Sequence, residues 1–357
     1  MVGRRSPARA VSRAVLLAIL PCAISIRPLP LAADEPAAAI APAAAVNVSG
    51  RVEVSGGATI DGGRAQSIPA EGEAGLDVET AASRRAKGLV SITIDHEGTV
   101  ELERAYLKAR FPILGEAGDL RLTAGKAPLA WGKGFVFNAG DLVFDPVPEF
   151  TSFTSDEYRT EADWMIVGYA PFSAFSFVEL VYLPPVDDGA ANRAGGRLFV
   201  TPDLSLLQSI EAGYLYDEAA SHAAYLAVAG SLLVDYYASA SWDFDLEELI
   251  VSAGLFRVIA PSSRVPVTVR AECLWYPDNA ETYWYPAIEA AVLDELSVGV
   301  QALFISGDNR HSLPEAVALV ATAKPIEDLT IWVSAARPLA SDGIPDALVG
   351  YGIRFEF

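Results

Sequence analysis

Hydrophobic and polar residues alternate along most of the chain from residue 46 onward, in segments separated by clusters of Gly, Pro, Asp, Asn and Ser. Because successive side chains of a β-strand point to opposite faces, each segment predicts a strand with one apolar and one polar face. We predict eighteen strands, or sixteen if the weakest segments, 73–80 and 193–200, are left out. The predicted strands are 46–55, 73–80, 87–95, 99–111, 119–126, 162–170, 174–183, 193–200, 205–216, 221–230, 233–243, 247–258, 265–276, 281–292, 297–306, 313–323, 329–338 and 346–357.

The C-terminal segment has the clearest alternation and ends on an aromatic residue. Its apolar positions are Val349, Tyr351, Ile353, Phe355 and Phe357, and its intervening positions are Gly350, Gly352, Arg354 and Glu356. The segment resembles the closing strand of bacterial outer-membrane β-barrels. The resemblance implies an all-β fold, a transmembrane antiparallel up-and-down β-barrel of about 16–18 strands. It also implies that Tyr351, Ile353, Phe355 and Phe357 face lipid as the insertion signal for the barrel assembly machinery, with Arg354 and Glu356 in the lumen.

The connections between the predicted strands form two classes. The short class is often marked by Pro, at 112–118, 171–172, 201–203, 260–262 and 324–326. The longer class is rich in Asp, Asn and Gly, at 184–196, 277–280, 307–311 and 341–345. Short turns are typical of the periplasmic end of such barrels and long loops of the extracellular end. A soluble β-sandwich is the alternative, but aromatic pairs near strand ends, such as Trp275-Tyr276, favour the girdles of a membrane barrel.

The N-terminus predicts export from the cytoplasm. Residues 1–33 combine basic residues, a short apolar stretch over 14–26 and small residues at 32–33, as in a cleaved signal peptide. Residues 34–45 are Ala- and Pro-rich and predict a flexible leader, so the barrel is expected over 46–357. Removing five arginines with the signal peptide changes the net charge from −20 to −25 (−20 minus 5). The predicted mature chain keeps one cysteine, Cys273, and therefore has no internal disulfide.

Six cations gather between residues 104 and 133 of this acidic chain: Arg104, Lys108, Arg110, Arg121, Lys126 and Lys133. In strand 99–111, Glu101 and Glu103 occupy odd positions, whereas the cations occupy even ones, which predicts a β-bulge near Arg104. Neighbouring strands then bring Lys108, Arg110 and Arg121 together on the lumen wall. These cations form either luminal ion pairs or a basic ladder at a constriction that orients and selects polar solutes. The predicted pore-lining or constriction residues are Glu101, Glu103, Arg104, Lys108, Arg110, Arg121, Lys126, Lys133, Asp141, Arg270 and Glu272.

The segment 125–146 carries a second resemblance. It contains Gly125-Lys126, Trp131-Gly132-Lys133-Gly134, Asn138, Asp141 and Pro146. This pattern resembles a motif of Gram-negative outer-membrane porin-like families, such as the alginate-export-type porins, and implies a barrel channel without naming its solute. Its glycines permit tight turns, and Asn138 and Asp141 can satisfy backbone donors in a loop. The connection 127–161 is the longest one, so it either folds into the lumen as a constriction or only shapes the wall.

The residues give little support to an enzyme. The three histidines lack metal-ligand spacing, and Ser221 and His222 are sequence neighbours that point to opposite faces of a strand. We expect no metal, no cofactor and no nucleic-acid partner, because an acidic chain repels nucleic acid. We predict a passive outer-membrane channel for small polar or charged solutes, surrounded by outer-membrane lipid and lipopolysaccharide. The alternative is a surface-exposed barrel whose acidic loops bind a partner, without a useful pore. The oligomeric state is not predicted.

Overall fold

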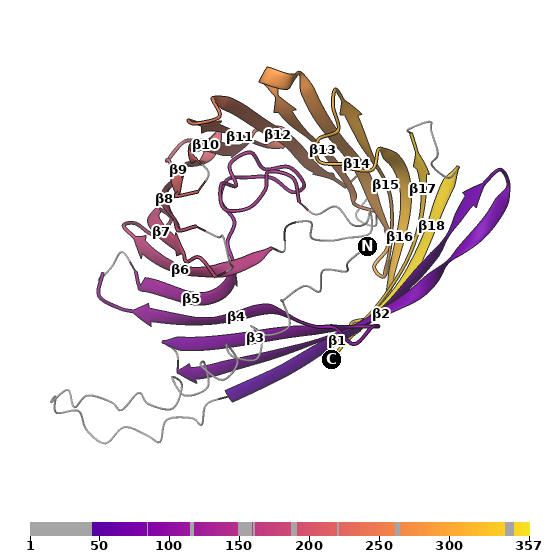
Figure 1. Ribbon diagram of the computed structural model, residues 1–357, viewed down its shortest axis with the longest axis horizontal. Helices are drawn as coiled ribbons and strands as arrows, with labels where there is room; N and C mark the ends of the chain where they lie inside the picture. Colours follow the sequence, from indigo (N-terminus) through magenta and orange to yellow (C-terminus); the bar gives the residue numbers. More distant parts are fainter. Residues whose placement is uncertain are drawn as a thin grey trace, which may run out of the picture. The chain divides into compact units, whose positions relative to one another are not determined.

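The computed structural model describes residues 45–83, 85–114, 118–148, 159, 161–186, 191–219, 221–260, 265–339 and 346–357. Over these residues the chain forms one antiparallel sheet of 18 strands that closes into a barrel (Figure 1). Every strand pairs with its sequence neighbours, and β1 pairs with β18 to close the ring. The predicted fold class is confirmed, with eighteen strands rather than sixteen. The predicted signal peptide and nearly all of the predicted leader lie outside the described residues and stay predictions.

The strands run as follows: β1 (Ala45–Asp61), β2 (Arg64–Ser83), β3 (Ala86–Asp95), β4 (Val100–Phe111), β5 (Leu120–Pro128), β6 (Ala162–Pro171), β7 (Phe177–Leu183), β8 (Arg193–Val200), β9 (Leu207–Asp217), β10 (His222–Ser231), β11 (Asp235–Asp243), β12 (Glu248–Ile259), β13 (Val267–Tyr276), β14 (Glu281–Leu293), β15 (Leu296–Ser306), β16 (Ala316–Ile326), β17 (Leu329–Pro338) and β18 (Ala347–Glu356). One 3-10 turn, η3 (Pro277–Asn279), joins β13 to β14. Among the described residues, the structure contains no helix that is long and apolar enough to cross a bilayer.

The outer face of the barrel is apolar. Large hydrophobic side chains stay exposed on strand after strand, at the positions that alternate with the inward-facing ones: Val54, Val90, Leu107, Leu122, Ile166, Leu180, Leu198, Leu226, Leu255, Ile288, Val300, Leu319, Val333, Tyr351 and Ile353. In water such a continuous apolar surface would be unfavourable, whereas a lipid bilayer covers it. The C-terminal strand follows the same pattern, because Tyr351 and Ile353 are exposed whereas Gly352 between them is buried.

The first hairpin is longer than predicted. Residues 56–72, predicted as a connection, continue β1 and β2 to a two-residue turn at Gly62 and Gly63, both with positive φ. Ala58 and Gln66, which lie in this part, belong to paired strands although the segment has no apolar alternation. The pairing rests on backbone hydrogen bonds, which any sequence without a helix or turn signal can make. The β3 partners of β2 begin only at Glu73, so the tip of the hairpin extends beyond β3.

A register shift interrupts the pairing of β3 with β4. Ser91 pairs with Arg104, whereas Ile92 pairs with Leu102, so Glu103 is the additional residue of a β-bulge. The bulge predicted near Arg104 is therefore confirmed. It moves the inward-facing positions of β4 from odd to even residues, and this places Lys108 and Arg110 on the inner face.

Because neighbouring strands are antiparallel, successive connections lie alternately at the two ends of the barrel. We call the end that carries the connections after even-numbered strands the short-turn end, and the opposite one the long-loop end. The connection from β5 to β6 starts at the long-loop end, and its residues 129–148 lie inside the ring of strands (Figure 1). We call residues 129–148 the inner loop.

The buried core lies between the inner loop and the barrel wall. One apolar cluster joins Val136 and Phe137 of the inner loop to Leu274 and Tyr283 of the wall. A second cluster joins Trp131 of the loop to other wall residues of β6, β7, β9 and β10. Trp131 is 0% exposed and Phe137 1%. Burial of such side chains contributes roughly 1.5–3 kcal/mol each, so the loop is part of the core.

Candidate functional site

Three buried carboxylates of the wall hold the inner loop. Glu179, Glu211 and Glu272 lie on β7, β9 and β13 and are 6%, 1% and 2% exposed. All three side chains accept hydrogen bonds from the inner loop. A buried carboxylate is costly unless it is paired or hydrogen-bonded, so these contacts hold the loop against the wall.

Glu272 makes the largest number of these contacts. One oxygen, Oε2, accepts from the backbone N–H of Val136 at 2.9 Å and of Phe137 at 3.0 Å. The other oxygen accepts from the N–H of Phe135 at 3.2 Å and from the hydroxyl of Tyr237. Three consecutive backbone donors thus point at one carboxylate, an arrangement typical of anion-binding turns. Glu272 was predicted to line the pore, but it is covered by the loop and serves as its anchor.

Glu179 and Glu211 share a single cation. The guanidinium of Arg197 contacts Glu179 at 2.8 Å and Glu211 at 2.9 Å. Glu179 also accepts from the indole N–H of Trp131 at 2.9 Å, and Glu211 accepts from the N–H of Gly132 at 2.8 Å. Arg197 completes the contact by donating to the carbonyl oxygen of residue 130 at 2.7 Å. The start of the inner loop is therefore fixed by a buried network of charges.

The sequence motif of the loop holds it in its folded shape. Asn138 donates to the carbonyl oxygen of Trp131 at 2.6 Å and accepts from the N–H of Gly140 at 3.1 Å. Asp141 accepts from the N–H of Phe144 at 3.3 Å and forms an ion pair of 2.8 Å with Arg159. The predicted bonds from backbone donors to Asn138 and Asp141 are confirmed. Asp141 is 3% exposed, so its placement differs from the predicted pore-lining one.

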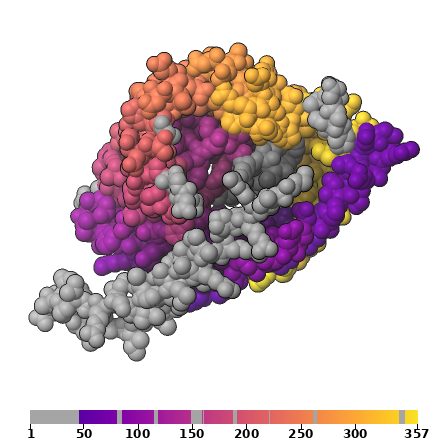
Figure 2. Space-filling model, viewed as in Figure 1, coloured from indigo at the N-terminus to yellow at the C-terminus, as the bar shows by residue number. Residues whose placement is uncertain are grey.

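The inner loop contacts the wall from β6 around to β16, and Figure 2 shows the strands of this side in pink to orange. The wall from β1 to β5 carries a different set of side chains. At the bulge, Arg51 bridges Glu73 at 2.9 Å and Glu103 at 2.7 Å. Arg104 faces inward in register with Ser91. Glu101, in register with the buried Thr93, faces the same way.

The predicted cations of β4 and β5 converge on this wall. Arg110 and Arg121 are direct cross-strand partners, and Lys108 pairs with Thr123 one step along the same strands. Lys108 lies 4.8 Å from the ring centre of Tyr106, and Arg121 lies 4.8 Å from that of Tyr169. None of the three cations forms an ion pair with a carboxylate of the described residues. Like charges on directly opposed residues repel, so this triad is unfavourable without an anion.

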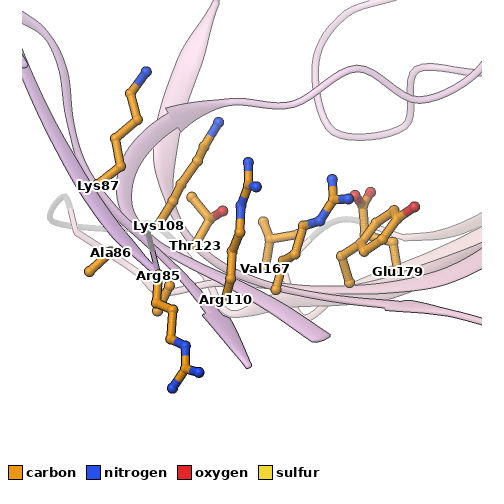
Figure 3. A pocket seen from close by; sticks show the side chains of 11 residues that line it. Arg85, Ala86, Lys87, Lys108, Arg110, Thr123, Val167 and Glu179 are labelled. Carbon is orange, nitrogen blue, oxygen red and sulfur yellow. The ribbon is translucent and has the colours of Figure 1, made fainter. Parts of the chain in front are cut away.

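The triad lines a cavity of about 390 Å³ at the short-turn end of the lumen. Lys87 of β3 and Glu179 of β7 belong to the same lining, and Figure 3 shows Lys87, Lys108 and Arg110 pointing in the same direction. Arg85 also borders the cavity, but Figure 3 shows it pointing the other way. Two of these groups are occupied elsewhere, since Lys87 pairs with Glu79 at 2.6 Å and Glu179 pairs with Arg197. Sequence analysis did not predict Lys87 as a lining residue, because it stands outside the group of cations between residues 104 and 133.

Lys126 has a different orientation from the predicted one. It is the cross-strand partner of Ala105 and Trp164, which alternate with the inward-facing Tyr106 and Met165, so Lys126 starts from the outer face. Its ammonium group donates to the carbonyl oxygen of Leu102, next to the bulge, at 2.7 Å. A charged group facing lipid needs such a partner, and the bulge supplies a carbonyl group that the ladder leaves available. The predicted pore-lining position of Lys126 is therefore wrong.

The remaining predicted residues contact the inner loop. Arg270 stacks on Phe135 with 3.3 Å between the guanidinium carbon and the ring centre. Lys133 belongs to the loop itself, and its ammonium group lies 5.2 Å from the ring centre of Phe199. Its backbone N–H donates to the hydroxyl of Ser239 at 3.3 Å. Both cations thus lie at the boundary between loop and wall.

Among the residues that the structure describes, Ser221 and His222 do not form a nucleophile–base pair. Ser221 donates to Asp243, whereas the ring of His222 lies 3.0 Å from the hydroxyl of Tyr214. His311 bonds to the hydroxyl of Tyr276 at 2.8 Å. Within the described segments, no group of three His, Cys, Asp or Glu side chains is placed to hold a metal ion.

Comparison with known proteins agrees with this architecture. No protein-family model matches the sequence, and no curated protein matches it. Wzi of Escherichia coli, an outer-membrane protein involved in group 1 capsule assembly and a carbohydrate-binding β-barrel, superposes with a TM-score of 0.60 at 11% identity, covering 87% of this chain and 84% of Wzi. OccK11 of Pseudomonas aeruginosa gives a TM-score of 0.57 at 10% identity, covering 87% of this chain and 95% of OccK11. OccAB4 of Acinetobacter baumannii gives 0.56 at 7% identity, covering 87% and 98%.

The chain has the fold of outer-membrane β-barrels. Its structural neighbours include porins, and at these identities the likeness concerns the fold alone. The resemblance of segment 125–146 to alginate-export-type porins stays a prediction, because no family model matches the chain.

Proposed function

We propose that this protein is an outer-membrane channel for passive diffusion of small polar or charged solutes. The observation that carries the proposal is the asymmetric lumen. The inner loop packs on the wall from β6 to β16, whereas the wall from β1 to β5 keeps a triad of cations without carboxylate partners among the described residues. A loop fixed on one wall narrows a barrel, and the charges on the other wall act on every solute that passes.

In this proposal, outer-membrane lipid and lipopolysaccharide surround the apolar outer face, and the barrel assembly machinery inserts the chain through its C-terminal strand. The predicted signal peptide directs export through the inner membrane and is then cleaved. The short-turn end faces the periplasm and the long-loop end faces outward, as the lengths of the connections indicate. No catalytic role is part of the proposal.

Conductance in planar lipid bilayers tests the channel. The refolded protein is expected to insert with stepwise increases in current at low voltage. An absence of steps, for protein shown to be folded by its heat-modifiable migration in gels, contradicts the proposal. Liposome-swelling rates for neutral sugars, amino acids and carboxylates then rank the solutes by size and charge.

Reversal potentials test the role of the triad. Replacing Lys108, Arg110 and Arg121 together by glutamine is expected to shift ion selectivity toward cations, because the lumen loses three positive charges. Replacement of Lys324, which lies near the short-turn end of β16 outside the cavity, is the matched control. A reversal potential that the triple variant leaves unchanged means that the triad has only a structural role.

The alternative, a barrel that binds a partner through acidic loops, has less support. Asp243 at the end of β11 accepts from the N–H groups of Asp245 and Leu246 at 3.0 Å and 2.9 Å, so this acid stabilises its own turn. Wzi, whose fold is similar, is a carbohydrate-binding β-barrel, which is the observation that favours this alternative. Loop-dependent binding to cells or to polysaccharide, in a protein that does not conduct, would favour this alternative.

A further inference from the structure

The cavity at the short-turn end has an excess of positive charge that the described residues do not neutralise. Among its lining residues, Lys87 and Glu179 already have partners of opposite charge. Lys108, Arg110 and Arg121 do not, so three positive charges converge from two adjacent strands. Opposed cations of this kind are stabilised when an anion lies between them.

The arrangement favours an anion with its charge concentrated at one point. Arg110 and Arg121 lie directly opposite each other, and Lys108 is two residues from Arg110 on the same face of β4. Guanidinium groups bind carboxylate or phosphate through two parallel hydrogen bonds, and an ammonium group adds a third donor. A carboxylate has two oxygens and one charge, whereas a phosphate monoester has three terminal oxygens and a charge of about −1.5 to −2 at pH 7. The phosphoryl group therefore matches the triad better in both charge and number of acceptors.

The cavity also has room for more than a phosphoryl group. Its volume of about 390 Å³ lies within the range of small-molecule pockets, which is roughly 300–1,000 Å³. Next to the cations, the lining continues with Thr123, Val167 and the ring of Tyr169. That ring is held in place by Phe177, with 4.5 Å between the ring centres. An aromatic and aliphatic surface beside a cationic triad suits an organic group attached to the phosphate.

We infer that this cavity is a binding site for small organic phosphate monoesters, with Lys108, Arg110 and Arg121 on the phosphoryl oxygens and Tyr169 beside the organic group. The inference deepens the proposed channel function, on which its physiological meaning rests, by naming a solute class that pauses at the short-turn end. The site itself needs no transport, so binding and conductance fail or succeed separately.

Equilibrium dialysis of the refolded full chain in detergent micelles tests the site, with phenyl phosphate as the probe. Benzoate, which has the same ring with one negative charge, and inorganic phosphate, which lacks the ring, are the comparison ligands. Phenyl phosphate is expected to bind more tightly than either. Equal affinity for benzoate would overturn the preference for a phosphoryl group, and equal affinity for inorganic phosphate would overturn the role of Tyr169 and the organic group.

Substitutions locate the binding. The Arg110→Gln and Arg121→Gln double variant is expected to bind phenyl phosphate at least about tenfold more weakly, the effect of losing one or more charge-assisted hydrogen bonds. Arg104→Gln is compared with Arg110→Gln as the matched control, since each removes one positive charge from the same face of β4 and only Arg110 lines the cavity. An equal loss in the control would mean a diffuse positive field rather than a site. If the double variant does not fold, Lys108→Gln alone is expected to weaken binding severalfold, and unchanged binding in that variant overturns the assignment.

Discussion

The replacement Glu272→Gln tests whether the wall carboxylates hold the inner loop. The two oxygens of Glu272 accept three backbone N–H bonds from the loop and one bond from Tyr237. Glutamine has the same shape but offers only one oxygen. Its NH2 group can only donate, so it cannot accept a hydrogen bond from a backbone N–H of the loop. At least one backbone bond is lost whichever way the amide is turned, because the hydroxyl of Tyr237 can accept from the NH2 group but a backbone N–H cannot, and the other backbone bonds lose their charged acceptor.

The size of the effect follows from these bonds. A hydrogen bond to a charged group contributes about 1.5–3 kcal/mol and a neutral one about 0.5–1.5 kcal/mol, so one lost backbone bond and two weakened ones reduce the attachment of the loop by about 3 kcal/mol. A difference of 3 kcal/mol changes an equilibrium constant by roughly a hundredfold. The barrel itself is expected to stay folded, because its pairing of strands does not involve this side chain.

Hydrogen–deuterium exchange of peptides that cover residues 131–140 measures the attachment directly. We expect exchange in these peptides to become roughly a hundredfold faster in the variant, with no change in the barrel strands. Glu289→Gln is the matched control, because Glu289 is an exposed acid of the neighbouring strand β14. Loop exchange that stays as slow as in the unmodified protein would refute the anchoring role of Glu272.

Three other predictions concern the barrel. The backbone of Phe357 makes two hydrogen bonds to β1, at 2.8 Å and 2.9 Å. Deletion of Phe357 is expected to reduce membrane insertion without blocking export, as measured by the heat-modifiable fraction in membranes. Normal insertion would contradict the insertion signal assigned to the last strand. Gly125→Ala is expected to destabilise the barrel by about 1–3 kcal/mol or more, because φ is +126° and a Cβ atom would lie 2.1 Å from a carbonyl oxygen of β4. Gly168→Ala, with nothing within 4 Å of its Cβ, should leave urea unfolding unchanged, and equal effects of the two would refute the steric argument. Arg197→Met leaves the buried Glu211 without its cation and is expected to cost about 3–5 kcal/mol, again by urea unfolding; an unchanged midpoint would mean that the network around Glu211 is not structural.

The sequence alone determined the strands, their even number and the approximate course of the wall. Alternation with a period of two is a local property, so each strand can be recognised without its partners. The bulge near Arg104 could also be predicted, because two acids and a run of cations in one strand cannot share a face without a shift of register. From that shift followed the convergence of Lys108, Arg110 and Arg121, which the structure shows.

Only the tertiary structure decided what each inward-facing residue does. Glu272 and Asp141 have the same local pattern as a pore-lining acid, but the inner loop covers them, and that packing depends on contacts between residues more than a hundred positions apart, such as Val136 with Glu272. Lys126 shows a second limit of sequence analysis. Strict alternation from Arg121 places its side chain on the outer face, but only the structure shows that it bonds to Leu102 beside the bulge of the neighbouring strand. The hairpin tip around Gly62 was missed because backbone hydrogen bonds, rather than apolar side chains, hold it. Local alternation therefore determines a barrel, whereas long-range packing determines which inward-facing residues of its wall the inner loop covers.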